Sequence, residues 1–235
     1  MALPKIETPT YSLELPSTGE KIKFRPFLVK EQKVLMMAQE AKSDEQIANA
    51  IGNLVRSCTF DKVDVETVPM FQIEYLFLQI RAKSAGETAT LKVTCPDDKK
   101  TSVEIKVNLE EIKPQMNVAH NNEVIITDTI KLYLKYPVLD DMKGVLVNAD
   151  DITRVFSILT KCISSIHYGE EVYNRVDMTD KDIEDFIDQL TTQQFEEIME
   201  FFDTMPKLRH VVSVTNPNTK VKSDVTIEGL QNFLV

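Results

Sequence analysis

The stretch that decides how this chain folds runs from Phe71 to Arg81 and reads FQIEYLFLQIR. Four of its apolar residues recur at helical spacing and share one face: Ile73, Leu76, Phe77 and Ile80. Three more lie on the other faces: Phe71, Tyr75 and Leu78. Pro69, just before this stretch, suits a first helical turn. A helix that is apolar nearly all round is either central in the fold or covered by a partner.

Strand patterns flank this helix on both sides. Alternating residues predict two hairpins, one at 10–15 and 21–27 and one at 88–94 and 102–107. Between them, Ser43 and Gln46 are spaced as a capping box for a second helix. Its apolar stripe consists of Ile47, Ile51, Leu54, Val55 and Cys58. The first half of the chain therefore reads as hairpin, helices, hairpin.

The second half repeats this order. It predicts a hairpin at 123–127 and 130–136, helices starting at Asp150, Thr179 and Thr191, and a hairpin at 211–215 and 220–227. Residues also match in one consistent order, including VTCP at 93–96 with VTNP at 214–217, and Cys58 with Cys162. We therefore predict an α+β fold of two tandem related units, 1–119 and 120–235, the second lengthened around 163–175. Chance similarity among common α+β elements is the alternative.

Composition excludes several classes of protein. The 235 residues are 43% hydrophobic and 27% charged, as in a globular protein, and carry a net charge of −10. That excess of acid argues against binding nucleic acid or anionic lipid. No apolar run approaches the roughly 18–20 residues of a membrane span, and residues 1–10 lack the apolar core of a signal peptide. Three scattered cysteines favour a reducing compartment over a disulfide framework.

No catalytic constellation is visible. The histidines, His120, His167 and His210, lie far apart in sequence. Phosphate loops, nucleophile elbows and paired-histidine zinc motifs are all missing from the sequence. Cys58 and Cys162 end apolar stripes, which is typical of buried structural thiols. We therefore predict no enzyme, no catalytic residue, no cofactor and no small-molecule substrate.

The two hairpin tips at 95–98 and 216–219 are the places where a zinc ribbon would hold its metal. A zinc ribbon places two thiolates on a C-x-x-C spacing in each of two such turns. Of those four positions only Cys95 is a thiol, and the others are Asp98, Asn216 and Thr219. We therefore predict no metal at the tips.

Residues 177–203 carry the strongest charge feature. They hold ten acids and one base, Lys181, so their net charge of −9 is nearly that of the whole chain. Apolar residues at helical spacing, such as Ile183 and Ile187, make a solvated helical face the simpler interpretation. The functional alternative is an acidic docking face for a basic partner.

Four strings resemble the baseplate hub and hub-assembly proteins of T-even-like contractile-tailed bacteriophages: PTYSLELPSTG (9–19), FRPFLVKE (24–31), IEYLFLQIRAKS (73–84) and FFDTMPKL (201–208). The resemblance extends over nearly the whole chain, and none of the strings encodes a reaction. It implies a part in building the baseplate hub, as an assembly factor, a retained subunit, or both. Some members carry cysteine pairs at the two hairpin tips, and this chain departs from that pattern at three of the four positions.

The resemblance and the missing site together predict a non-enzymatic protein that contacts other hub or tail proteins. It would shield apolar or strand-edge surfaces of hub subunits in the host cytoplasm during assembly, and as a retained subunit it would also be found in the virion tail. We expect exposed contact residues at Arg25, Phe27, Tyr75, Arg81 and Lys83, for which core packing and solvated charge are the alternatives. Two other functions stay open: an enzyme or ligand-binding protein with a composite pocket, and an acidic decoy that mimics nucleic acid.

Overall fold

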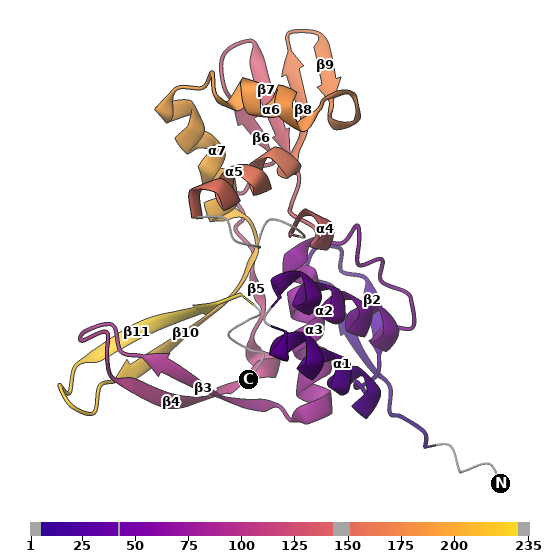
Figure 1. Ribbon diagram of the computed structural model, residues 1–235, viewed down its shortest axis with the longest axis vertical. Helices are drawn as coiled ribbons and strands as arrows, with labels where there is room; N and C mark the ends of the chain where they lie inside the picture. The colour runs from indigo at the N-terminus through magenta and orange to yellow at the C-terminus, as the bar shows by residue number, and fades with distance from the viewer. Residues whose placement is uncertain (1–5, 42, 143–150, 230–235) are drawn as a thin grey trace.

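The computed structural model describes residues 6–41, 43–142 and 151–229. Helices and small antiparallel sheets form two bodies, which confirms the predicted α+β class (Figure 1). The larger body consists of the described residues within 6–116 and 207–229, and the smaller body of the described residues within 117–206. Two hydrophobic clusters fill the larger body and a third fills the smaller one.

Three helices and three hairpins build the larger body. Its elements are β1 (Tyr11–Glu14), β2 (Lys21–Phe24), α1 (Val29–Glu40), α2 (Asp44–Cys58), α3 (Met70–Ala85), β3 (Thr88–Thr94), β4 (Ser102–Asn108), the 3-10 turn η1 (Leu109–Glu111), β5 (Pro114–Gln115), β10 (Lys207–Thr215) and β11 (Lys222–Glu228). The sequence did not specify α1, because its apolar residues run continuously from 34 to 38 and form no single helical stripe. Pro69 is the N-cap of α3 and does not lie in its first turn.

Helix α3 is the centre of this body. Its residues Ile73, Leu76, Phe77 and Ile80 belong to the first cluster, with α2 and the β1–β2 hairpin. On the opposite side, Tyr75 and Leu78 join the second cluster with the β3–β4 and β10–β11 hairpins. The apolar helix is therefore central in the fold, and it is covered by the chain itself and not by a partner.

The two long hairpins extend side by side from α3 (Figure 1). β3 pairs with β4 from Thr88–Asn108 to Thr94–Ser102, and β10 pairs with β11 from Arg209–Glu228 to Thr215–Lys222. Leu91, Val93, Val214 and Ile227 are buried in one cluster between them. β10 also pairs with β5, so this late segment of the chain is fixed to the larger body.

A four-stranded antiparallel sheet and its helices build the smaller body. Its elements are β6 (Glu123–Ile125), β7 (Ile130–Leu134), α4 (Leu139–Met142), α5 (Asp151–Cys162), β8 (Ile163–Tyr168), β9 (Glu171–Asn174), the 3-10 turn η2 (Arg175–Asp177), α6 (Asp180–Ile187) and α7 (Thr192–Thr204). Thr179 and Thr191 cap α6 and α7 as predicted, whereas Asp150 lies outside the described residues. The sheet order is β6-β7-β8-β9, and the segment 163–175, where the duplication hypothesis expects the second unit to be longer, holds the β8–β9 hairpin.

The two halves of the sequence share one local arrangement. The Arg25 N–H donates to the Cys58 carbonyl at 2.9 Å, and the Lys135 N–H donates to the Cys162 carbonyl at 2.8 Å. Each of these basic residues also pairs with a carboxylate six positions later, Glu31 for Arg25 and Asp141 for Lys135. A duplication would produce such matched contacts, and it stays a prediction. Its division at 119/120 does not coincide with the two bodies, since β10–β11 lies in the larger one.

Helix α4 joins the bodies. The Met70 N–H at the start of α3 donates to the Pro137 carbonyl at 2.9 Å. Two residues on, Leu139 is 2% exposed, and it lies against Gly52 of α2 so closely that a Cβ at Gly52 would be 2.5 Å from Leu139 Cδ2. The Leu139 side chain of the smaller body thus fills a space in the larger body that exists because position 52 is glycine.

Candidate partner-binding surfaces

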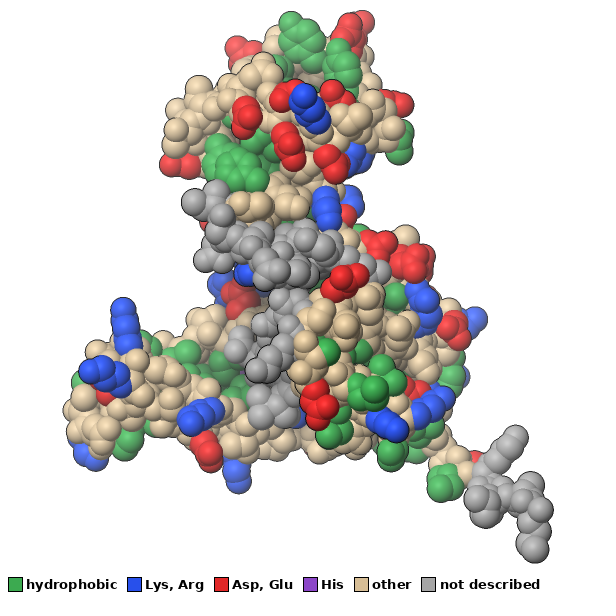
Figure 2. All heavy atoms as spheres, in the orientation of Figure 1, with side chains coloured by type: hydrophobic (Ala, Val, Ile, Leu, Met, Phe, Trp, Pro, Cys, Tyr) green, Lys and Arg blue, Asp and Glu red, His purple; other side chains and the backbone are tan. Residues whose placement is uncertain are grey.

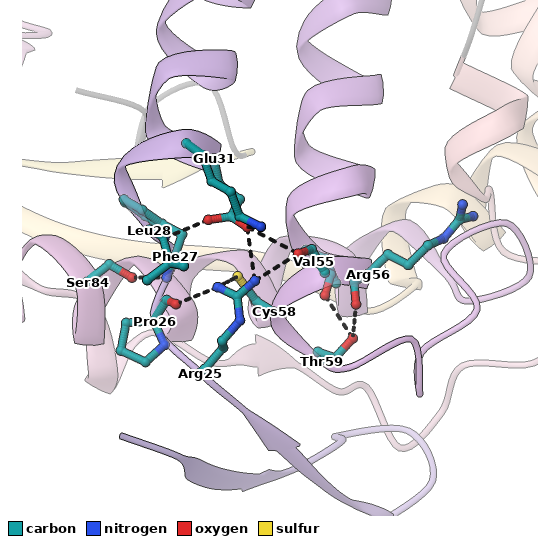
Figure 3. A network of polar contacts seen from close by, with 12 residues as sticks. Arg25, Pro26, Phe27, Leu28, Glu31, Val55, Arg56, Cys58, Thr59 and Ser84 are labelled. Carbon is teal, nitrogen blue, oxygen red and sulfur yellow. Dashed lines mark hydrogen bonds and ion pairs between the residues drawn. The ribbon is translucent and has the colours of Figure 1, made fainter. Parts of the chain in front are cut away.

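Arg25, one of the five expected contact residues, is held inside the larger body (Figure 3). Its guanidinium donates to Glu31 Oε1 at 2.9 Å, to Ser57 Oγ at 2.8 Å and to the Pro26 carbonyl at 2.9 Å. It also contacts Cys58 Sγ at 3.7 Å. The Arg25 and Glu31 side chains are only 13% and 9% exposed. The described contacts of Arg25 therefore fasten β2 to α1 and α2.

Glu31→Gln tests this buried pair. We expect it to lower the free energy of unfolding by about 2 kcal/mol at pH 7, because Arg25 keeps its charge and loses its counter-charge. Burial raises the pKa of Glu31, but Arg25, the Leu28 N–H and Ser57 together outweigh it and leave that pKa lowered. The pair's stabilisation is therefore full above the ordinary glutamate pKa of about 4.3 and is lost as pH falls through the lowered pKa.

Urea unfolding at pH 7 and pH 3 measures this difference. Glu66→Gln is the matched control, because Glu66 pairs with Arg56 on the surface, where its side chain is 60% exposed, and should change stability little. An equal loss for Glu31→Gln at both pH values would show that the charge of Glu31 contributes nothing.

The other four expected contact residues lie around α3. Tyr75 is 8% exposed and packs in the second cluster, so its expected surface exposure is wrong: both hairpins cover that side of the helix. Phe27 packs on the first cluster and donates its N–H to Ser84 Oγ at 2.9 Å. Lys83 pairs with Glu87 at 2.9 Å and with Glu110. Arg81 is partly buried, and this burial lowers its pKa.

Two cysteines are buried as expected. Cys58 and Cys162 are fully buried at the ends of α2 and α5. Burial raises the pKa of the Cys58 thiol to about 11 and that of the Cys162 thiol to about 12. Both thiols therefore stay protonated at neutral pH, whereas the thiolate is the reactive form.

Side-chain hydrogen bonds connect the tip of the β3–β4 hairpin to the tip of the β10–β11 hairpin. Asn216 Nδ2 donates to both carboxylate oxygens of Asp97 at 3.1 Å, and Thr219 Oγ1 donates to Asp97 Oδ2 at 2.5 Å. Asp98 turns back into its own tip, where it accepts from the Thr101 N–H at 2.9 Å. Among the described residues, no three His, Cys, Asp or Glu side chains are grouped to hold a metal ion. The residue that accepts these hydrogen bonds between the tips, Asp97, is not one of the four positions at which a zinc ribbon would hold its metal.

Exposed apolar side chains gather on α1 and on α5. On the α1 segment the exposed fractions are 39% for Leu28, 80% for Val29, 52% for Val34, 54% for Met36 and 60% for Met37. Figure 2 shows hydrophobic surface over this part of the larger body and a second patch on the smaller body. Because soluble proteins rarely leave contiguous apolar surface exposed, both regions are candidate partner-binding surfaces.

Open hollows lie on the surface of the smaller body. One of about 470 Å³ lies between β6 and α7 and is lined by residues that include Glu123, Glu197, Glu200 and Phe201. Glu123 already accepts from Tyr133 and pairs with Lys131. No described helix is both long enough and apolar enough to cross a bilayer.

Comparison with known proteins decides the family. A family model described as T4 bacteriophage base plate protein matches residues 8–235, which is nearly the whole chain. The chain belongs to this family. No curated protein and no solved structure matches it. The match confirms the resemblance to T4-like baseplate proteins that the four sequence strings carry.

As a baseplate protein, the chain is a component of the phage tail, and its partners are other tail or baseplate proteins. Sequence reasoning placed its contact residues on and around the most apolar helix, which the fold buries. It missed α1, where apolar side chains point outward. The signal that could have found α1 is the run VLMMA at 34–38, which is too continuous to form one buried stripe.

Proposed function

We propose that this baseplate protein is a non-enzymatic part of the baseplate hub, acting in its assembly through protein–protein contacts. The observation that carries the proposal is the outward-facing apolar surface of α1. Val29 and Met36 are seven residues apart and therefore lie on one face of the helix, with exposed fractions of 80% and 54%. Shielding by a neighbouring tail protein would remove this surface from water, which is the main driving force of association.

The composition of the α1 surface favours a protein partner over a ligand. Methionine side chains are flexible and polarisable, and they adapt to differently shaped apolar partners. Lys33 lies between Val29 and Met37 on the same side of the helix, and Lys30, whose side chain is 70% exposed, lies two turns before Met37. The surface therefore combines apolar area with positive charge that can orient a partner. A composite catalytic pocket has no comparable support, and neither does a nucleic-acid decoy, since ten of the acids are concentrated in residues 177–203 instead of being spaced like phosphates over a wide surface.

Purification of tail assembly intermediates and of mature particles from infected cells tests the proposal. Presence in intermediates alone would identify an assembly factor, and presence in both would identify a retained subunit of the virion tail. If the chain accompanied no tail protein in either fraction, the proposed function would be wrong.

A pair of variants locates the contact. Val29→Lys with Met36→Lys should lower recovery with tail proteins at least about tenfold, because two charges would enter an apolar interface. Thr90→Lys with Ser164→Lys is the matched control, since both residues are exposed and lie away from α1. Equal recovery of the two variants would exclude the α1 surface as the contact.

A further inference from the structure

The second apolar patch lies on the smaller body between α5 and α7. We define the α5–α7 patch as Val155, Phe156, Phe195, Met199 and Phe202. Val155 and Phe156 are each 38% exposed, and the other three are partly buried. The Phe156 and Phe195 rings stack with centroids 5.1 Å apart and planes 18° apart. This aromatic pair joins the apolar faces of α5 and α7.

Helix spacing explains why this patch is apolar and yet open. On α5, Val155 and Phe156 are one turn before Leu159, which is fully buried in the third cluster. On α7, Phe195, Met199 and Phe202 form a ridge beside the buried pair Ile198 and Phe201. Each helix therefore has a broader apolar face than the body covers. Strong amphipathic patterning with part of the apolar face left exposed indicates a surface for a partner.

Acidic residues border the patch. Glu196 and Asp203 lie three and four positions from Met199, so they share its side of α7, and both are exposed. Figure 2 shows acidic side chains around the hydrophobic patch of the smaller body. The border belongs to a wider segregation of charge. Residues 117–206 hold 18 acids and 7 bases, a net charge of −11, and the rest of the chain holds 19 acids and 20 bases, a net charge of +1.

We propose that the α5–α7 patch docks a segment of another tail protein that carries bulky apolar side chains flanked by lysine or arginine. The apolar centre selects apolar anchors, and the acidic border favours basic flanks and rejects acidic ones. A second copy of this chain fits poorly, since self-pairing would set two acidic borders against each other. The inference rests on the proposed function and adds the chemistry of one partner.

Site-specific photo-crosslinking tests the patch in the full chain. Phe156→benzoylphenylalanine, produced during infection, should crosslink to a tail protein, in a peptide with apolar residues and with lysine or arginine within a few positions. Phe60→benzoylphenylalanine is the matched control, because Phe60 is 46% exposed on the larger body. That control should not capture the same peptide. Crosslinks from position 156 to an acidic peptide, to another copy of the chain or to its own residues alone would overturn the inference.

Charge reversal tests the border. Glu196→Lys with Asp203→Lys should lower the crosslink yield from position 156 about tenfold at low salt, and the wild-type yield should fall as salt screens the attraction. Asp128→Lys with Glu170→Lys makes the same change of net charge at exposed sites outside the patch and should leave the yield within about twofold. Equal losses of crosslink yield for both pairs of substitutions would show that the acidic border takes no part in docking.

The outcomes separate this inference from the proposed function. If the chain accompanies tail proteins but position 156 captures none of them, only the α5–α7 docking site is wrong. If the chain accompanies no tail protein at all, the proposed function fails with it.

Discussion

Phe77→Ala is expected to lower the free energy of unfolding by about 3–5 kcal/mol, a far larger loss than a surface substitution causes. Phe77 is fully buried in the middle of α3, where its ring packs with α2 and the β1–β2 hairpin in the first cluster. Removing it costs the transfer free energy of the ring and leaves a cavity that the neighbouring side chains fill only in part. Because globular domains are stable by only about 5–15 kcal/mol, such a loss removes a large part of the stability of the protein.

Urea unfolding followed by circular dichroism measures this loss. Phe60→Ala is the control, since the Phe60 ring is 46% exposed and its positive φ of 57° strains phenylalanine and alanine alike. We expect the control to lose about 1 kcal/mol or less. Similar losses for the two variants would mean that α3 is not the centre on which the larger body depends.

The sequence pattern predicted α3 because helix periodicity is a local property. The same holds for the caps at Thr179 and Thr191 and for both long hairpins, in each of which the paired strands are near neighbours in sequence. Pattern alone left open whether the chain or a partner covers α3. That answer depends on where the β10–β11 hairpin lies, and this hairpin is separated from α3 by the whole of the smaller body.

The candidate sites were harder to predict than the fold. Arg25 and Lys83 look like solvated charges in the sequence, yet each lies beside carboxylates: Glu31 for Arg25, and Glu87 and Glu110 for Lys83. At the hairpin tips, zinc spacing singles out Asp98, whereas the link to Asn216 and Thr219 uses Asp97. Docking surfaces are harder still, since a single exposed apolar residue has the same sequence signal as a buried one, and only a continuous run such as 34–38 differs from a buried stripe.

Leu139→Ala is expected to lower the free energy of unfolding by about 2–5 kcal/mol, because Leu139 is 2% exposed and forms the junction of the two bodies. Its side chain occupies the space above Gly52, which Val65 also borders. The space exists because position 52 has no side chain: a Cβ there would be 2.5 Å from Leu139 Cδ2, a distance that forces Leu139 to move. Glycine is otherwise a poor choice in the middle of α2, where alanine is favoured by about 1 kcal/mol.

A double-mutant cycle separates these two effects. Gly52→Ala should be neutral or destabilising in the wild-type chain, since the clash with Leu139 offsets the helix propensity that alanine adds. In the Leu139→Ala background the same change should stabilise the protein by about 1 kcal/mol, because the space is then empty. If Gly52→Ala had the same effect in both backgrounds, the two residues would not be coupled. Helix α4 would then not be the element that fixes the smaller body, with its acidic border, to the larger body, which carries the apolar surface of α1.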